Sequence, residues 1–130
     1  MNIIEALDKQ SIEAGSIYFA PPDYHLLIED SNNLSLSKDD KVNFSRPSID
    51  VLFESAANVF ADKTIAILLT GANNDGSVGC KQIKDSGGLV IVQSPESAEH
   101  RFMPQSAINI MQPDLIAPPE QIAQYLIGLF

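Results

Sequence analysis

Two continuous apolar runs, residues 64–70 and 87–94, most constrain what this chain can fold into. Neither TIAILLT nor GGLVIVQS contains a charged residue, which is typical of strands buried on both faces of a parallel sheet. The residues between them predict a loop followed by a helix over residues 76–86. This strand–helix–strand order predicts an α/β fold in which right-handed crossovers join parallel strands.

Helices are also expected on both sides of this unit. In RPSIDVLFESAANVF, residues 46–60, apolar side chains recur at spacings of three and four, and Pro47 is expected at the first helical position. A short helix is expected after Pro104, and residues 118–130 predict a final amphipathic helix. The order predicts a doubly wound, mostly parallel sheet with helices on both faces.

The first 40 residues are expected to add an N-terminal β-hairpin to this sheet. SIYFA, residues 16–20, and YHLLIED, residues 24–30, read as strands that a proline-containing turn joins, and LSLS, residues 34–37, is expected to extend the hairpin. Only two buried parallel strands are recognisable, which is few for a doubly wound sheet. We therefore expect residues 1–130 to form a single but incomplete domain that lacks a front part.

The composition excludes several classes of protein. The chain has 130 residues, of which 45% are hydrophobic, which suits one ordered domain with a single core. A net charge of −9 and a pI of about 4.4 argue against binding to nucleic acid or to anionic membranes, because both carry phosphate groups. No apolar run is long enough for a membrane span and no secretion signal is visible, so a cytoplasmic location is expected.

Metal sites and disulfides are not expected either. Cys80 is the single cysteine, and the two histidines, His25 and His100, lie far apart in the sequence. Cys80 is expected in the core. A structural role is favoured for His25, since a catalytic histidine needs a positioned partner.

The loop after the first apolar run, TGANNDGSVG at residues 70–79, lies where α/β sheets gather functional groups, at the carboxyl end of a strand. Its glycines, Gly71, Gly76 and Gly79, do not have the G-x-G-x-x-G spacing of dinucleotide sites. No Gly-Lys-Ser/Thr sequence of a phosphate-binding loop is present. We therefore expect no nucleotide cofactor.

Two interpretations of this loop remain open from the residues alone. In the first, Asn74, Asp75 or Ser77 caps the following helix, since these residue types are preferred there. In the second, Asp75 orients a histidine that activates a serine, as in acyl-transfer triads. Composition does not favour one over the other.

Four ordered segments between Gly15 and Ile108 resemble the catalytic domain of chemotaxis protein-glutamate methylesterases (CheB-type), in its C-terminal part. They are GSIYFAPPDYHLLIE, RPSIDVLFESAA, AILLTGANNDGSVG and GGLVIVQSPESAEHRFMPQSAI. These segments are similar to the family's G-x-x-Y-x-A-P-x-D-x-H hairpin, its Arg-Pro-Ser-x-Asp-x-Leu-Phe helix start, its LTG-x-x-x-DG-x-x-G loop and its Gly-x-x-x-x-x-Gln strand before Met-Pro.

The resemblance implies a cytoplasmic enzyme of two-component chemotaxis signalling that hydrolyses glutamate methyl esters with a Ser-His-Asp triad. Asp75 falls on the triad aspartate. Ala72 stands where the family often has a methionine whose backbone N–H helps bind the oxyanion, and Asn74 and Met103 are expected to line the pocket. No cofactor is implied.

The family's serine loop and histidine segment have no counterpart in this chain, so we expect it to be inactive alone. The partners that the resemblance implies are cytoplasmic helices of methylated chemoreceptors and, beside them, the missing N-terminal segment or a receiver domain. The serines present lack the Gly-x-Ser-x-Gly context of a nucleophile. The alternative is a non-catalytic signalling module, either receiver-like or a degenerate methylesterase, although the sequence lacks the lysine that a receiver carries after a late strand.

Overall fold

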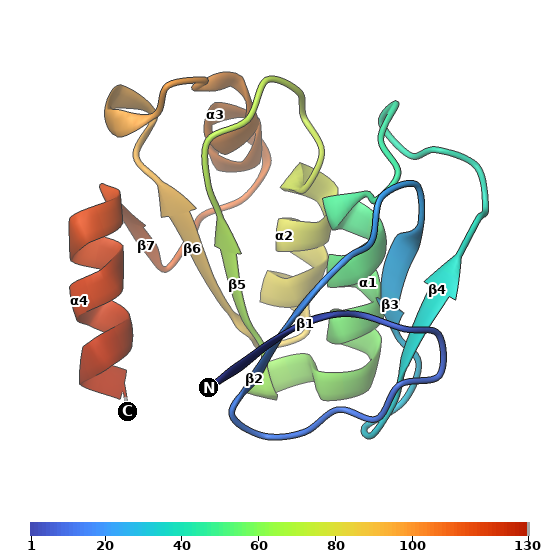
Figure 1. Cartoon of the computed structure of the whole chain (residues 1–130). Coiled ribbons are helices and arrows are strands. Elements are labelled where there is room, and N and C mark those ends of the chain that lie inside the picture. Colours follow the sequence, from blue (N-terminus) through green and yellow to red (C-terminus); the bar gives the residue numbers. More distant parts are fainter. Residues whose placement is uncertain (130) are drawn as a thin grey trace.

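Three parallel strands form the central sheet of the computed structural model, which describes residues 1–129 (Figure 1). They are β5 (Ile65–Leu68), β6 (Leu89–Gln93) and β7 (Leu115–Ala117), in the order β5–β6–β7. The two predicted strands are confirmed. The third, β7, was not predicted, because its three residues lie between prolines and are too few to show a period.

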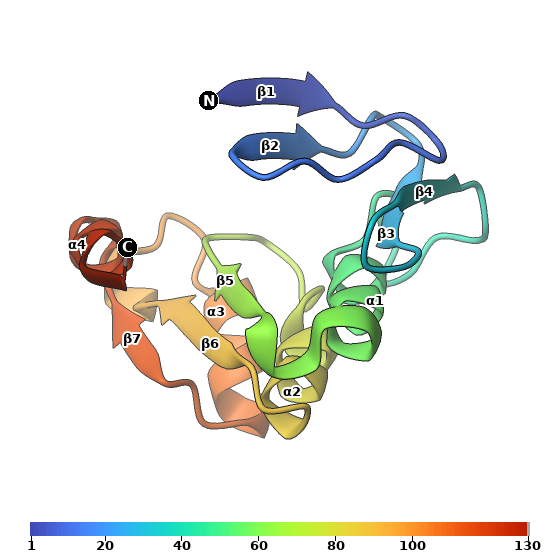
Figure 2. The ribbon, with the colours of Figure 1, turned by 90° about the horizontal axis from the view of Figure 1, so that it is seen from below.

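Helices cover both faces of this sheet, as predicted. The helices α1 (Ile49–Phe60), α2 (Ser77–Asp85) and α3 (Phe102–Ile110) lie on one face, and α4 (Pro119–Leu129) lies on the other (Figures 1 and 2). Short 3-10 helices follow α1 (Ala61–Lys63) and β6 (Pro95–Ser97). The last predicted residue of α4, residue 130, lies outside the described residues.

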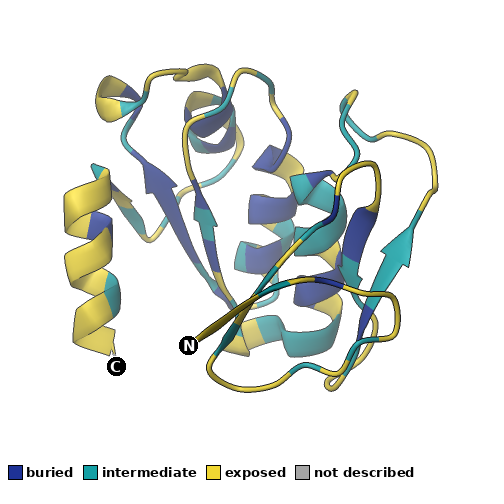
Figure 3. Cartoon of the chain, viewed as in Figure 1, coloured by how far each residue is buried: buried dark blue, intermediate teal, exposed yellow. Residues whose placement is uncertain are grey.

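Alternating residues of β6 supply the core on the two faces. Val90 and Val92 are fully buried against α1, α2 and α3, whereas Ile91, also fully buried, packs with Ile122 of α4. Burial of each such side chain stabilises the fold by roughly 1.5–3 kcal/mol. Figure 3 shows how burial concentrates in β5, β6 and α2, whereas much of α4 is exposed. No helix within residues 1–129 combines the length and apolarity needed to span a bilayer.

The N-terminal part contains a β-hairpin, as predicted, but the strands that form it are not the two that were predicted to pair. β2 (Ser16–Phe19) pairs in parallel with β1 (Asn2–Glu5), which was not predicted, and β3 (His25–Ile28) pairs antiparallel with β4 (Leu34–Ser37). Pro21 and Pro22 have no N–H to donate, so the turn that contains them cannot begin a ladder between β2 and β3. Figure 2 shows the β1–β2 pair set apart from the central sheet.

Two predicted helix starts also shift. Ser48, not Pro47, precedes α1 as its cap, and its hydroxyl accepts a hydrogen bond from the N–H of Val51 at 3.4 Å. The helix α3 begins at Phe102, two residues before Pro104. A proline is tolerated there because N–H groups in the first helical turn have no partner within the helix.

Candidate functional site

The carboxylate of Asp75 lies at the start of α1, although Asp75 itself follows β5 and precedes α2. Its Oδ1 accepts from the Ser48 hydroxyl at 2.8 Å, the Asp50 N–H at 3.1 Å and the Asn43 amide at 3.0 Å. Its Oδ2 accepts from the Ile49 N–H at 2.6 Å. With only 2% of its surface exposed, Asp75 is a buried carboxylate held by four donors.

This geometry corrects the capping interpretation of the loop. The helix α2 is preceded by Gly76, in the left-handed region at φ 98°, and no side chain from Asn74, Asp75 or Ser77 caps it. Asp75 instead satisfies N–H groups of α1, a helix that begins 26 positions earlier. Helix starts carry partial positive charge and unpaired N–H groups, so a carboxylate is favoured there.

The start of α2 receives a carboxylate from α1 in return. Oδ1 of Asp50, in the first turn of α1, accepts from the N–H groups of Gly76 at 3.0 Å and Gly79 at 2.7 Å. Gly79 lets the helices approach closely, because a Cβ atom there would lie 2.6 Å from the Cβ of Phe53. The two helices are therefore locked together at their N-terminal ends, directly beside Asp75.

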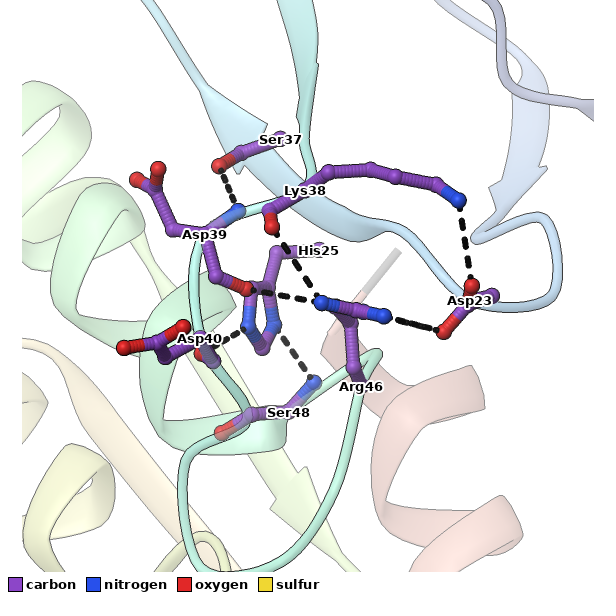
Figure 4. Close-up of polar contacts among 8 residues, drawn as sticks. All are labelled: Asp23, His25, Ser37, Lys38, Asp39, Asp40, Arg46 and Ser48. Atoms are coloured by element: carbon purple, nitrogen blue, oxygen red, sulfur yellow. Dashed lines mark hydrogen bonds and ion pairs between the residues drawn. The ribbon is translucent and has the colours of Figure 1, made fainter.

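Ser48 and His25 also lie near Asp75, but they do not form a triad with it. Nδ1 of His25 accepts from the backbone N–H of Ser48 at 3.1 Å, and its Nε2 donates to the carbonyl of Asp40 at 2.9 Å (Figure 4). A triad requires the histidine between the serine hydroxyl and the carboxylate. Here the hydroxyl contacts the carboxylate directly and both ring nitrogens are occupied, so His25 is structural, as predicted.

Arg46 fixes the segment that leads into α1. Its guanidinium forms an ion pair with Asp23 at 2.7 Å and donates to the carbonyls of Lys38 and Asp39 at 3.2 and 3.3 Å (Figure 4). Hydrogen bonds from Arg46 and Lys38 hold the pKa of Asp23 below its ordinary value. These contacts join Arg46 to residues 38–39 and to Asp23, and so hold the chain just before α1.

The three residues predicted to line the pocket lie in different surroundings. Ala72 and Asn74 are exposed on the same loop as Asp75, whereas Met103 is buried, with 8% of its surface exposed. The N–H of Met103 donates to the carbonyl of Gly71 at 3.0 Å, and a Cβ atom on Gly71 would lie 2.5 Å from the Met103 methyl. Met103 therefore packs against Gly71, at the start of the loop, and holds it in place.

Gln93, at the end of β6, joins the loops that follow β5 and β6. Its Oε1 accepts from the Thr70 N–H at 2.9 Å, and its Nε2 donates to the carbonyl of Ser97 at 3.2 Å. Thr70 in turn exchanges two hydrogen bonds with the backbone of His100, at 2.8 and 3.1 Å. The signal for this role was a single polar residue at the end of an apolar run, which the sequence interpretation left without a function.

Cys80 lies in the core on α2, fully buried, as predicted. Burial, with a smaller contribution from the charge of Asp50, raises the pKa of its thiol to about 12. A thiol in this state is a poor nucleophile and a poor metal ligand. Across residues 1–129 the structure shows no cluster of three or more histidine, cysteine or acidic side chains arranged for a metal ion.

Comparison with known proteins identifies the fold and the family of this chain. The crystal structure of the Thermotoga maritima CheB methylesterase catalytic domain superposes with a TM-score of 0.91 at 36% identity, over 97% of this chain and 68% of that one. A relative from Leptospira interrogans is 51% identical over 129 residues, which are 99% of this chain and 67% of the relative.

The Thermotoga maritima protein-glutamate methylesterase/protein-glutamine glutaminase is 36% identical over 132 residues, which are 99% of this chain and 38% of that protein. Enzymes so named are carboxylic ester hydrolases, and these similarities leave the receiver-like alternative without support. The family model described as CheB methylesterase matches residues 1–126. The chain therefore belongs to the CheB methylesterase family.

Proposed function

We propose that this chain supplies the aspartate of a Ser-His-Asp site that hydrolyses glutamate methyl esters on cytoplasmic helices of chemoreceptors, within two-component chemotaxis signalling. The observation that carries this proposal is the state of Asp75. It is 2% exposed, lies at the carboxyl end of β5 and is fixed by four donors. A triad carboxylate has to be fixed in this way, because it sets the orientation of the histidine ring.

The distribution of donors indicates which oxygen receives the histidine. Oδ1 of Asp75 accepts three hydrogen bonds and Oδ2 accepts one. A carboxylate offers about four lone-pair positions, two on each oxygen. The Oδ2 atom therefore has acceptor capacity left for an imidazole N–H.

The open edge of the central sheet favours one position for the serine and the histidine. β5 ends the order β5–β6–β7 and pairs only with β6 among the described strands. Because carboxyl ends of parallel strands meet at one edge of a sheet, a strand added in parallel beside β5 would bring its loop next to the Asp75 loop. We propose that the segment carrying the serine and the histidine binds there.

In the proposed reaction, the histidine takes the proton of the serine hydroxyl while the serine oxygen attacks the ester carbonyl. The tetrahedral intermediate then expels methanol, which takes the proton from the histidine, and water hydrolyses the acyl-serine to release the glutamate carboxylate. The Ala72 N–H has no hydrogen-bond partner among residues 1–129, which makes it a candidate donor to the oxyanion. Asn74 lies on the exposed side of the same loop as a candidate substrate contact.

The names of several relatives also include protein-glutamine glutaminase. The same site suits the side chain of glutamine as a substrate. Attack on an amide carbonyl gives the same acyl-serine, and ammonia leaves in place of methanol. We propose this deamidation as a second reaction of the assembled site.

The test measures methanol release from methylated receptor fragments. Residues 1–130 alone are expected to give none, since loss of triad members costs about 10⁴-fold or more. Addition of the serine- and histidine-bearing segment, or its presence on the same polypeptide, is expected to give turnover that Asp75→Asn abolishes. Turnover by residues 1–130 alone, or by the assembled Asp75→Asn protein, would contradict the proposal.

A further inference from the structure

The side-chain amide of Asn43 lies between the two carboxylates at the start of α1 and α2. Its Nδ2 donates to Oδ2 of Asp50 at 2.7 Å and to Oδ1 of Asp75 at 3.0 Å. Asp75 is buried, and Asp50 is half-buried beside it. Two carboxylates that share one donor lie close enough to repel one another, and the hydrogens of the amide offset that repulsion.

The chemistry of this bridge requires an amide. One nitrogen carries two hydrogens, and each is directed to a different carboxylate. The reverse orientation would place the amide oxygen against two carboxylate oxygens, so the acceptors determine which way the amide points. A hydroxyl has one hydrogen and cannot serve both.

The backbone around Asn43 is built to hold the amide in this position. Asn43 and Phe44 have φ values of 53° and 64°, and Val42 and Ser45 exchange backbone hydrogen bonds of 3.0 and 2.9 Å. A two-residue hairpin turn of type I′ needs two left-handed residues, and asparagine adopts that conformation readily. The two turn residues differ in exposure, because Phe44 is 97% exposed and Asn43 is half-buried.

A second contact ties this turn to the loop of Asp75. Nδ2 of Asn73 donates to the Ser45 hydroxyl at 3.3 Å, while its Oδ1 accepts from the N–H of Asp75 at 2.9 Å. The turn is therefore attached to the Asp75 backbone as well as to its carboxylate. These contacts restrict movement of the turn relative to the Asp75 loop.

We propose that Asn43 is a positioning residue for the reaction, because it holds the Asp75 carboxylate in the orientation in which Oδ2 receives the catalytic histidine. This proposal rests on the function proposed above for Asp75. Without the amide, Asp75 keeps its donors from Ser48, Ile49 and Asp50, but the two carboxylates repel each other unbridged, and the Asp75 carboxylate is expected to turn from this orientation. Small displacements of a catalytic group cost up to about 100-fold in rate.

The turn itself offers a matched pair of variants. Asn43→Gly and Phe44→Gly place the same residue at adjacent left-handed positions, where glycine is unstrained, but only the first removes the bridge. In the assembled esterase, Asn43→Gly is expected to lower kcat about 10- to 100-fold with KM unchanged, because no receptor contact is lost. Phe44→Gly is expected to retain kcat. Asn43→Asp keeps the shape but replaces the donor, and a loss at least as large is expected.

A measurement on residues 1–130 separates failure of this proposal from failure of the proposed function. The Ile49 and Asp50 N–H groups donate to Asp75, so their proton NMR shifts report its orientation. These two signals are expected to move in Asn43→Gly and not in Phe44→Gly. Thermal unfolding curves verify that both variants are folded. Unmoved signals, or a kcat in Asn43→Gly equal to that of Phe44→Gly, would overturn the role of Asn43. An inactive wild-type assembly would overturn the proposed function instead, and moved signals would then still support the bridge.

Discussion

Asp50 and Asp75 each bind the start of the helix that the other adjoins. The carboxylate of Asp50, on α1, accepts hydrogen bonds from N–H groups at the start of α2. The carboxylate of Asp75, just before α2, accepts hydrogen bonds from the first N–H groups of α1. Each carboxylate therefore stabilises an element in which it does not lie. Loss of one is expected to weaken both helices at their junction.

Asp75→Ala is expected to lower the free energy of unfolding by about 2–4 kcal/mol, because it removes a helix cap and leaves several buried donors unpaired. Glu54→Ala is the matched control, since Glu54 is exposed on α1, and a change within about 0.5 kcal/mol is expected. Urea unfolding followed by circular dichroism measures both. Equal stabilities for the two variants would refute the capping role of Asp75.

Gly79→Ala is expected to destabilise the chain by about 1–3 kcal/mol, because the added methyl would lie 2.6 Å from the Cβ of Phe53. Gly128→Ala is the control on α4, where nothing lies within 4 Å of the added atom. That substitution is expected to be neutral or to stabilise, by up to about 1 kcal/mol, through helix propensity. Melting temperatures of the two variants that shift in the same direction would contradict the close approach of α1 and α2.

His25→Ala is expected to cost about 2–4 kcal/mol, since it creates a cavity and leaves the Ser48 N–H and the Asp40 carbonyl without their partner. His100→Ala is expected to change stability by less than about 0.5 kcal/mol, because that residue is exposed. Denaturant midpoints of both variants provide the measurement. A His25→Ala protein as stable as His100→Ala would show that His25 is not structural.

Cys80 is expected to resist thiol reagents in the folded chain. Its pKa is raised to about 12, so almost no thiolate exists at pH 8, and the side chain is fully buried. Labelling with 5,5′-dithiobis(2-nitrobenzoic acid) is expected to be slow in buffer and fast in urea. In the unfolded chain the thiol is exposed and its pKa returns to the ordinary value of about 8.5. Rapid labelling in buffer would show that α2 opens.

Asp114 gives a pH-dependent contribution to stability. Burial alone would raise its pKa, but hydrogen bonds from Lys84 and the Val90 N–H outweigh this and hold the pKa below 3.8. A depressed folded-state pKa stabilises above the unfolded pKa, near 4, and the contribution is lost as pH falls through the folded value. Asp114→Asn is therefore expected to cost up to about 1 kcal/mol at pH 7, and progressively less below pH 4. A cost that is constant with pH would exclude this linkage.

The sequence predicted the parts of the fold that local periodicity determines. The apolar runs of β5 and β6 and the spacing of three and four in α1 were sufficient for those elements. The pairing of β1 with β2 was not predicted, because the register of short strands depends on contacts between segments. The strand β7 has only three residues, which are too few to show an alternation of apolar and polar side chains.

The sequence selected one residue of the candidate site, whose catalytic role stays a prediction, but not the donors that surround it. The motif resemblance selected Asp75, but the partners of its carboxylate come from residues 43–50, far from it in sequence. Capping rules apply to a neighbouring helix, so they assigned Asp75 to α2 instead of α1. The bridging amide of Asn43 appeared only once three segments were placed together.

For the triad proposed above, the placement of Asp75 at the start of α1 affects how an inactive form should be made. Replacing catalytic residues often stabilises a protein, because active sites are built at some expense of stability. At Asp75 the opposite sign is expected, since the same carboxylate closes a helix start. A substrate-trapping variant is therefore better made at the proposed serine, which leaves the junction of α1 and α2 intact.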